Sequence, residues 1–255
     1  MTEATEAWVE RAGLRWLEPK WNVPGVCAVS LSRAGGSSAG AWAGLNLSDA
    51  VGDDPEAVEV NRSRVRDVLG VQSPDWIRQR HGIAVARAGS GPVIADALLT
   101  QRSRASRTPC AILSADCLPV VLAARDGRAV GIAHAGWRGL LAGVVPNLLR
   151  ALDLPSGELS AWLAPCIGPE AFWVGPEVRR AYLMLWGEMA EGEFVACHVD
   201  RWQMNLAGLA ERQLRLLGVE HILRGSHCTH RDADTFYSYR REQTSGRQAT
   251  LAWLE

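Results

Sequence analysis

A cysteine and two histidines in this sequence are spaced so that they could hold one metal ion. Asp126-Gly127 is a strong signal for a two-residue hairpin turn. A turn at this place pairs His134 with position 119 on the opposite strand. Cys117 is the diagonal neighbour on the same face, at about 7–8 Å between backbones. The side chains of Cys117 and His134 can therefore converge on a single ion.

His81 could supply a third ligand. Residues 76–85 (WIRQRHGIAV) alternate in polarity, which predicts a strand with Gln79 and His81 on its apolar face. Two imidazoles and a thiolate match a catalytic zinc site whose fourth position is left to water or substrate, and they also suit copper. The alternative from the residues alone is a buried free cysteine and two core histidines. Pro119 weakens the hairpin argument, because proline is tolerated only at strand starts, edges or bulges.

Two other patterns are weaker signals. The stretch GSSAG around Ser38 matches the nucleophile elbow of hydrolases, but that motif needs a helix directly after it, and residues 41–54 are loop-like. A second possible metal cluster is close in sequence, although such a cluster also arises by chance: His227, Cys228 and His230.

The composition indicates a globular protein and excludes several other classes. The 255 residues include 27 basic and 28 acidic side chains, for a net charge of −1, and 47% are hydrophobic. A disordered chain and a basic nucleic-acid binder are therefore disfavoured. The sequence has no apolar run long enough to cross a membrane and no apolar leader, so we expect a cytoplasmic protein. The six cysteines lack CxxC spacing and should be free thiols.

The elements that must position these residues are mixed. Asp54 and Pro55 begin a predicted helix that Gly70 ends. A later helix has Asp200 as its cap and Gly218 as its stop. The predicted helices are 55–69, 140–152 with a break or kink at Pro146, about 176–190 and about 201–217. The predicted strands are 76–85, 110–114, 120–124, 128–134, 219–223, 234–240 and 248–254. Without regular βαβ alternation, this order predicts an α+β fold, a single domain over residues 1–255 with mixed sheets flanked by helices.

Several motifs of the chain resemble the YfiH-like family, whose members are labelled laccase-domain or polyphenol oxidase proteins and are regarded as purine nucleoside phosphorylases. The resemblance runs nearly end to end, and ADCLP together with HAGWRG at this separation is highly specific. The matching segments are 44–62, RQRHG (78–82), DALLT (96–100), SADCLPVVLA (114–123), GIAHAGWRGLLAGVV (131–145), 164–178 and 228–247.

The resemblance implies a YfiH-like fold and a metal site. The family's ligand positions carry over to His81, Cys117 and His134. Three positions near these motifs depart from the usual residues without touching a ligand: Arg80, Ser114 and Ala164.

The resemblance also implies a zinc-dependent enzyme that acts on small-molecule nucleosides and inorganic phosphate. The expected reactions are phosphorolysis of adenosine, inosine, guanosine and methylthioadenosine, and deamination of adenosine. Phosphate calls for arginine forks, and Arg62 is the first candidate, with Arg240 and Arg33 behind it. For each arginine a structural ion pair is an equal alternative. Asp116 could orient a ligand or tie down the turn before Cys117.

Two other functions stay open at this point. One is a peptidoglycan-editing factor or cysteine hydrolase, in which Cys117 is the nucleophile and His134 its base. The other is a copper-dependent polyphenol oxidase, which six histidines without a His-x-His pair disfavour. We expect no nucleic-acid or membrane partner, and either a monomer or a homodimer.

Overall fold

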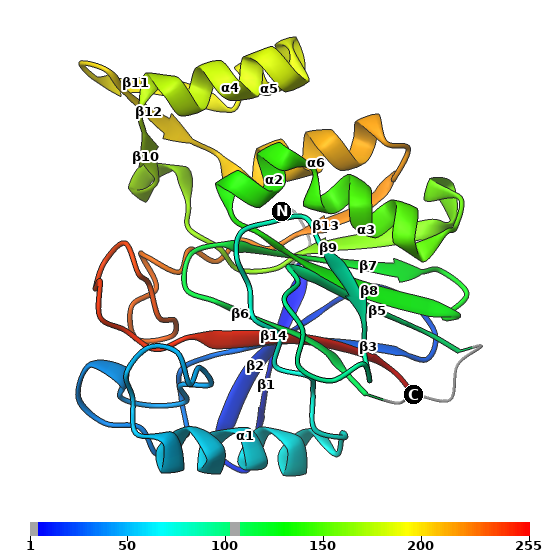
Figure 1. Cartoon of the computed structure of the whole chain (residues 1–255), viewed down its shortest axis with the longest axis vertical. Coiled ribbons are helices and arrows are strands. Elements are labelled where there is room, and N and C mark those ends of the chain that lie inside the picture. Colours follow the sequence, from blue (N-terminus) through cyan, green and yellow to red (C-terminus); the bar gives the residue numbers. More distant parts are fainter. Residues whose placement is uncertain (1–4, 103–107) are drawn as a thin grey trace.

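Two β-sheets lie face to face in the middle of the molecule, and helices cover the outer face of each (Figure 1). This computed structural model describes residues 5–102 and 108–255. The first sheet has the order β13 (His221–Arg224), β9 (Leu159–Leu163), β7 (Leu118–Ala124), β8 (Ala129–Ala135), β5 (Ala97–Gln101) and β4 (Val85–Arg87). The second has the order β1 (Glu6–Arg11), β2 (Leu14–Pro19), β3 (Val26–Leu31), β14 (Gln248–Leu254) and β6 (Cys110–Ser114).

The helices complete a four-layer arrangement. The outer face of the six-stranded sheet is covered by α2 (Trp137–Ala142), α3 (Val144–Leu152) and α6 (Leu206–Leu216), and that of the five-stranded sheet by α1 (Pro55–Leu69). A three-stranded sheet with two helices stands at the top of Figure 1: β10 (Trp173–Val174), β12 (Arg201–Met204), β11 (Phe194–His198), α4 (Pro176–Trp186) and α5 (Glu188–Glu191).

Alternating side chains of β7 divide the core between the layers. Val120 and Leu122 pack with the residues under the helices, whereas Val121 and Ala123 pack between the two sheets. All four side chains are fully buried. Because β7 and its neighbours are covered on both faces, the strand is a continuous apolar run rather than an alternating one.

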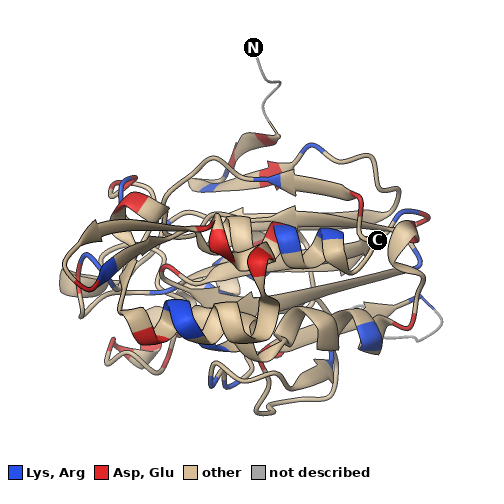
Figure 2. Ribbon diagram, turned by 90° about the horizontal axis from the view of Figure 1, so that it is seen from above, with Lys and Arg blue, Asp and Glu red and all other residues tan. Residues whose placement is uncertain are grey.

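Charged residues are spread over the outside. Viewed from above, basic and acidic positions are interspersed along the ribbons (Figure 2), in keeping with the net charge of −1. Among the described residues, no helix has the length and apolar character needed to cross a bilayer.

The predicted α+β class is confirmed, and so are two local predictions. Helix α1 begins after Asp54, whose side chain accepts a hydrogen bond from the Glu56 amide, and ends at Gly70 in the left-handed region. In the hairpin of β7 and β8, Pro119 pairs with His134, as the turn predicted.

The predicted strand at 76–85 is wrong. Only an isolated bridge between Arg78 and Ile94 and the short strand β4 lie in this region. His81 has a φ of +56° and is exposed, so it does not lie on an apolar strand face. The cause is a buried carboxylate, described below, which draws several consecutive amides into a turn.

Two helix predictions also need correction. The break before α3 lies at Gly143, whose φ is +100°, and not at Pro146. Proline fits in the first turn of a helix, because the amides there lack intrahelical partners. Residues 201–204 form strand β12, and α6 begins after Asn205, whose side chain accepts from the Gly208 amide. Asp200 is therefore not the helix cap.

The sequence did not predict strands β1, β2, β3, β5, β9, β10 and β11, and two further predicted elements differ from the structure. Gly187 separates α4 from α5 within the predicted helix 176–190. Residues 234–240 form turns instead of a strand. Tyr237 in this segment is held to the side chain of Gln248 rather than to a neighbouring strand, since its amide donates to Gln248 Oε1 at 2.8 Å.

Candidate metal centre

The three predicted ligands meet at one end of the β7–β8 hairpin. Cys117 directly precedes β7, His134 is the last but one residue of β8, and His81 lies in the turn before β4. One ligand atom from each of the three side chains lies within 4.8 Å of the others. Cys117 Sγ is 3.7 Å from His81 Nε2, and the two imidazole centroids are 4.8 Å apart. The structure therefore brings together the trio that the sequence predicted.

A single buried carboxylate positions both histidines. Asp96, directly before β5, accepts hydrogen bonds from the amides of Arg80 (3.2 Å), His81 (2.9 Å) and Gly82 (2.8 Å). Its Oδ1 also lies 3.0 Å from His134 Nδ1. A carboxylate only accepts, so the proton lies on Nδ1 of His134, and Nε2 is left free for a metal.

No motif or spacing in the sequence pointed to Asp96. The signal that could have found it is a lone aspartate at the head of the apolar segment DALLT, where a buried charge needs several partners.

Gly136 leaves the space that the trio needs. A Cβ atom at this position would lie 2.8 Å from His81 Cδ2 and 2.9 Å from Cys117 Sγ, closer than packed atoms tolerate. Any side chain here would push the imidazole and the thiol apart. The glycine that follows β8 is thus part of the geometry of the site.

Two further residues anchor the segments that carry His81 and Cys117. The side chain of Gln79 donates to the Leu113 carbonyl and accepts from the Leu113 amide, both at 2.8 Å, which ties the segment before His81 to β6. Asp116 accepts from Thr229 Oγ1 and from the Arg240 amide, both at 2.7 Å. These bonds agree with one of the two roles predicted for Asp116, which is to fix the turn before Cys117.

The electrostatics of the site favour a thiolate. Burial opposes ionisation of Cys117, but the charges and hydrogen bonds of His134 and His81 outweigh it and lower the thiol pKa to about 6. Burial would lower the pKa of His134, yet Cys117 and Asp96 raise it to about 9. Burial would raise the pKa of Asp96, but His134 and the turn amides lower it to about 2. Without a metal, Cys117 and His134 form a thiolate–imidazolium pair near neutral pH.

In metal-free protein, alkylation of Cys117 by iodoacetamide should be half-maximal near pH 6. Only the thiolate reacts, so the rate should rise with pH through the thiol pKa of about 6 and level off above it. Mass spectrometry of the modified peptide measures this rate for Cys117 alone. His134→Ala should move the midpoint upward, and bound zinc should block the reaction. A wild-type midpoint near the ordinary thiol value of 9.0 would contradict the ion pair.

The two weaker sequence patterns do not form functional sites. Among the described residues, the trio is the one group of three close enough to hold an ion, so the possible cluster around Cys228 does not form a metal site, in line with its weak signal. His227 instead lies 3.1 Å from Asp232 and packs edge-on against Trp8. Ser38 donates to an aspartate, Asp53, at 2.6 Å, and only a short 3-10 helix follows it, so it is no nucleophile elbow, as expected.

Each predicted substrate arginine has contacts with the protein itself. Arg62 donates to the Leu47 carbonyl at 3.0 Å and lies 3.5 Å from the Asp49 carboxylate. Arg33 donates to two carbonyls and stacks over a tyrosine ring. Arg240 is linked to the segment that carries Cys117, because its backbone amide donates to the Asp116 carboxylate. Its guanidinium donates to the Trp173 carbonyl at 3.3 Å.

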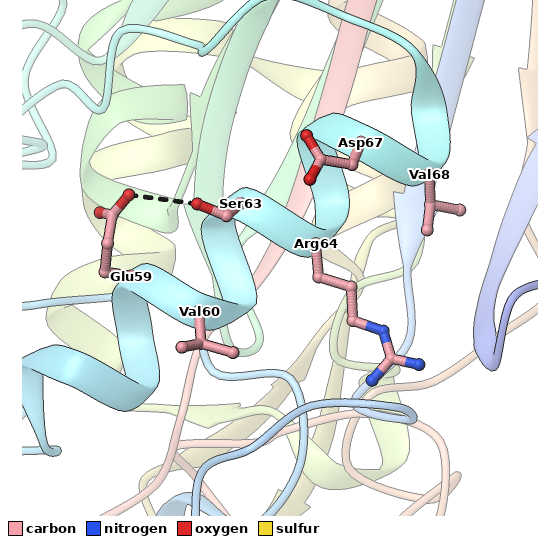
Figure 3. A pocket seen from close by; sticks show the side chains of 6 residues that line it. All are labelled: Glu59, Val60, Ser63, Arg64, Asp67 and Val68. Atoms are coloured by element: carbon pink, nitrogen blue, oxygen red, sulfur yellow. Dashed lines mark hydrogen bonds between the residues drawn. The ribbon is translucent and has the colours of Figure 1, made fainter.

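A shallow hollow elsewhere on the surface does not involve the trio. It lies along α1, where Ser63 donates to Glu59 at 3.3 Å (Figure 3). Its lining residues are Glu59, Val60, Ser63, Arg64, Asp67 and Val68.

Comparison with known proteins decides the family. The profile of a family described as multi-copper polyphenol oxidoreductase laccase matches residues 27–255. The chain belongs to this family. Purine nucleoside phosphorylase YfiH of Escherichia coli is 40% identical over 238 residues, which cover 92% of this chain and 97% of that protein. A purine nucleoside phosphorylase of Pseudomonas aeruginosa is 41% identical over 242 residues, covering 94% and 98%.

Solved structures of similar proteins have the same fold. A protein of Neisseria meningitidis superposes with a TM-score of 0.89 at 39% identity, covering 94% of this chain and 99% of that one. YlmD of Geobacillus stearothermophilus also gives a TM-score of 0.89, at 25% identity, covering 98% and 99%. The expected YfiH-like fold is thus confirmed.

Proposed function

We propose that this protein is a metal-dependent purine nucleoside phosphorylase. The observation that carries the proposal is the convergence of His81, Cys117 and His134, in a chain about 40% identical to proteins named purine nucleoside phosphorylase over more than nine-tenths of its length. In the proposed reaction, a phosphate oxygen bonds to C1′ of the ribose while the bond from C1′ to the purine breaks. The proton of the hydrogen phosphate passes to the base, which leaves with ribose 1-phosphate as co-product.

The trio fits zinc, which we propose as the resident metal. Two imidazoles and an anionic sulfur are ligands that zinc takes in catalytic sites, and Gly136 leaves room beside them. Bound zinc would act as a Lewis acid that polarises an oxygen of the substrate or of water. The donor set also accepts copper, but multicopper oxidase chemistry needs several metal sites. The described residues provide one suitable group.

The residues of the chain have defined tasks in this proposal. Cys117, His81 and His134 hold the metal, and Asp96 keeps the His134 proton on Nδ1, away from the metal side. Arg62, Arg240 and Arg33 stay candidates for binding phosphate or nucleoside. Because His81 is exposed and Cys117 is half-buried, a small-molecule substrate can reach the trio from that side.

Deamination of adenosine is the second activity that we propose for the same site. A metal that activates water can deliver it to C6 of adenine, as in other zinc deaminases. This reaction needs no phosphate, and adenosine would yield inosine and ammonia. We expect the enzyme to act in the cytoplasm, where nucleosides and inorganic phosphate are both present.

One observation favours a different candidate function. The thiolate–imidazolium pair of Cys117 and His134 is also the activated form of a cysteine nucleophile. A cysteine hydrolase, such as a factor that edits peptidoglycan precursors, would use Cys117 to attack a carbonyl. This alternative and the metal site predict different results for substitutions at Cys117.

Zinc-loaded protein should release hypoxanthine from inosine only when phosphate is present. Chromatography of the reaction should show free base and ribose 1-phosphate in equal amounts, and both should disappear when phosphate is left out or the metal is removed with a chelator. Base release without phosphate would indicate a hydrolase instead. Nucleosides that stay intact over a long incubation with phosphate and zinc would contradict the proposed function.

A further inference from the structure

Arg247 lies beside the chain segment that carries Cys117. It directly precedes β14, whose first residue, Gln248, pairs with Ser114 in β6. The antiparallel register therefore places Arg247 opposite the residues that lead from β6 into Cys117. Its backbone is fixed on both sides, since its amide donates to Asn46 Oδ1 at 2.9 Å and its carbonyl accepts from the Leu47 amide at 3.1 Å.

The guanidinium of Arg247 is braced on one side only. Its Nη1 donates to the carbonyls of Ser245 (2.8 Å) and Gly246 (2.9 Å), and the group stacks over the Tyr239 ring at 5.6 Å. Within residues 5–102 and 108–255, neither Nε nor Nη2 has a hydrogen-bond acceptor, and no carboxylate forms an ion pair with this arginine. Arg62 differs in having an ion pair. Its Nη2 lies 3.5 Å from the Asp49 carboxylate, although that nitrogen is buried without a hydrogen bond, and its Nε donates to the Leu47 carbonyl.

The surroundings of Arg247 leave its charge without a direct counterion. Burial lowers the pKa of Arg247, while the nearby charges of Cys117 and Asp116 act in the opposite direction. Neither of these acids bonds to the guanidinium. Both oxygens of Asp116 already accept from other donors, Thr229 and Arg240. A partly buried cation without a paired anion is unfavourable, and a bound oxyanion would relieve this.

We propose that Arg247 binds inorganic phosphate through its free Nε and Nη2 edge, next to the metal centre. The two parallel N–H donors of a guanidinium edge match two oxygens of a phosphate. The carbonyls of Ser245 and Gly246 and the ring of Tyr239 hold the group in place, so little side-chain freedom is lost on binding. The assignment of phosphate as the ligand rests on the proposed phosphorylase function.

The test compares phosphate binding by zinc-loaded wild type, Arg247→Gln and Arg247→Lys, using calorimetric titration with inorganic phosphate. Arg247→Gln should weaken phosphate binding roughly 10- to 100-fold, because charge-assisted hydrogen bonds are lost. Arg247→Lys should be intermediate, since it keeps the charge without the fork. In steady-state kinetics, the KM for phosphate should rise by the same factor, while the KM for inosine changes less than about twofold.

Arg102→Gln is the matched control. The guanidinium of Arg102 also donates to backbone carbonyls, those of Gly127, Glu255 and Gly25. It lies at the turn of the β7–β8 hairpin, at the other end from Cys117. This variant should bind phosphate like wild type. Thermal unfolding and zinc content show whether each variant is folded. Should Arg247→Gln lose its fold because its bracing bonds are gone, Arg247→Lys decides the question.

Equal phosphate affinity in wild type and in the folded Arg247 variants would overturn the proposal. The two proposals fail in different ways. Phosphorolysis with an unchanged phosphate KM in Arg247→Gln would remove Arg247 from phosphate binding and leave the phosphorylase function intact. Phosphate binding that depends on Arg247, in a protein that never cleaves nucleosides, would leave the anion site intact and contradict the phosphorylase function.

Discussion

Cys117→Ser should lose most of the bound zinc and reduce activity by more than about 100-fold, whereas Cys117→Asp should retain more of both. A serine hydroxyl stays protonated at neutral pH and is a poor zinc ligand, while an aspartate keeps an anionic oxygen that zinc accepts. Changes in the outer partners of a metal site already cost roughly 10- to 100-fold in affinity or activity, so loss of a direct ligand should cost more. Elemental analysis and the inosine assay measure the two effects on the same preparations.

Cys197→Ser is the control for this prediction. Cys197 is a half-buried free cysteine in β11, outside the trio, and its substitution should leave both zinc content and activity unchanged. If Cys117 were a nucleophile instead, Cys117→Ser and Cys117→Asp would both be inactive while zinc content did not follow activity. A covalent adduct on Cys117 during turnover, seen by mass spectrometry in wild type only, would contradict the ligand role.

The part of the site that the sequence predicted is the part governed by local geometry. A two-residue turn sets the register of a hairpin, and the period of two along each strand then determines which side chains share a face. Asp126 and Gly127 therefore predicted the register that pairs Pro119 with His134, although residues 125–128 join the two strands instead of a two-residue turn. Pro119 did not disturb the pairing, although it lies at the second position of β7.

The part that the sequence did not predict depends on contacts between distant segments. His81 belongs to the site, but it lies in a turn held by the carboxylate of Asp96, fifteen residues away, and no alternation pattern records such a turn. A strand pairing between β14 and β6 places Arg247 beside the segment that carries Cys117. Neither contact follows from propensity or spacing, because both are set by how the two sheets assemble.

Asp96→Asn should weaken zinc binding by roughly 10- to 100-fold and shift the pKa of the Cys117 thiol upward. The substitution removes the charge that stabilises the His134 imidazolium. With less positive charge on His134, the Cys117 thiolate loses its largest source of stabilisation. The new amide nitrogen also faces one or more of the turn amides of Arg80 to Gly82, which leaves a partly buried donor unpaired at a cost of about 1 kcal/mol or more. Competition with a zinc chelator and the pH profile of alkylation measure the first two effects.

Asp53→Asn separates these effects from a general loss of stability. Asp53 also accepts hydrogen bonds from buried neighbours, Ser38 at 2.6 Å and Asn46 at 2.8 Å, but no histidine contacts it. This variant should unfold at a lower temperature than wild type, yet keep the alkylation midpoint near pH 6 and the zinc affinity of wild type. If Asp96→Asn behaved in the same way, losing stability while the Cys117 midpoint and the zinc affinity stayed unchanged, Asp96 would only support the fold. A raised midpoint, with zinc binding restored at high zinc concentration, would instead show that its carboxylate positions and charges the two histidines.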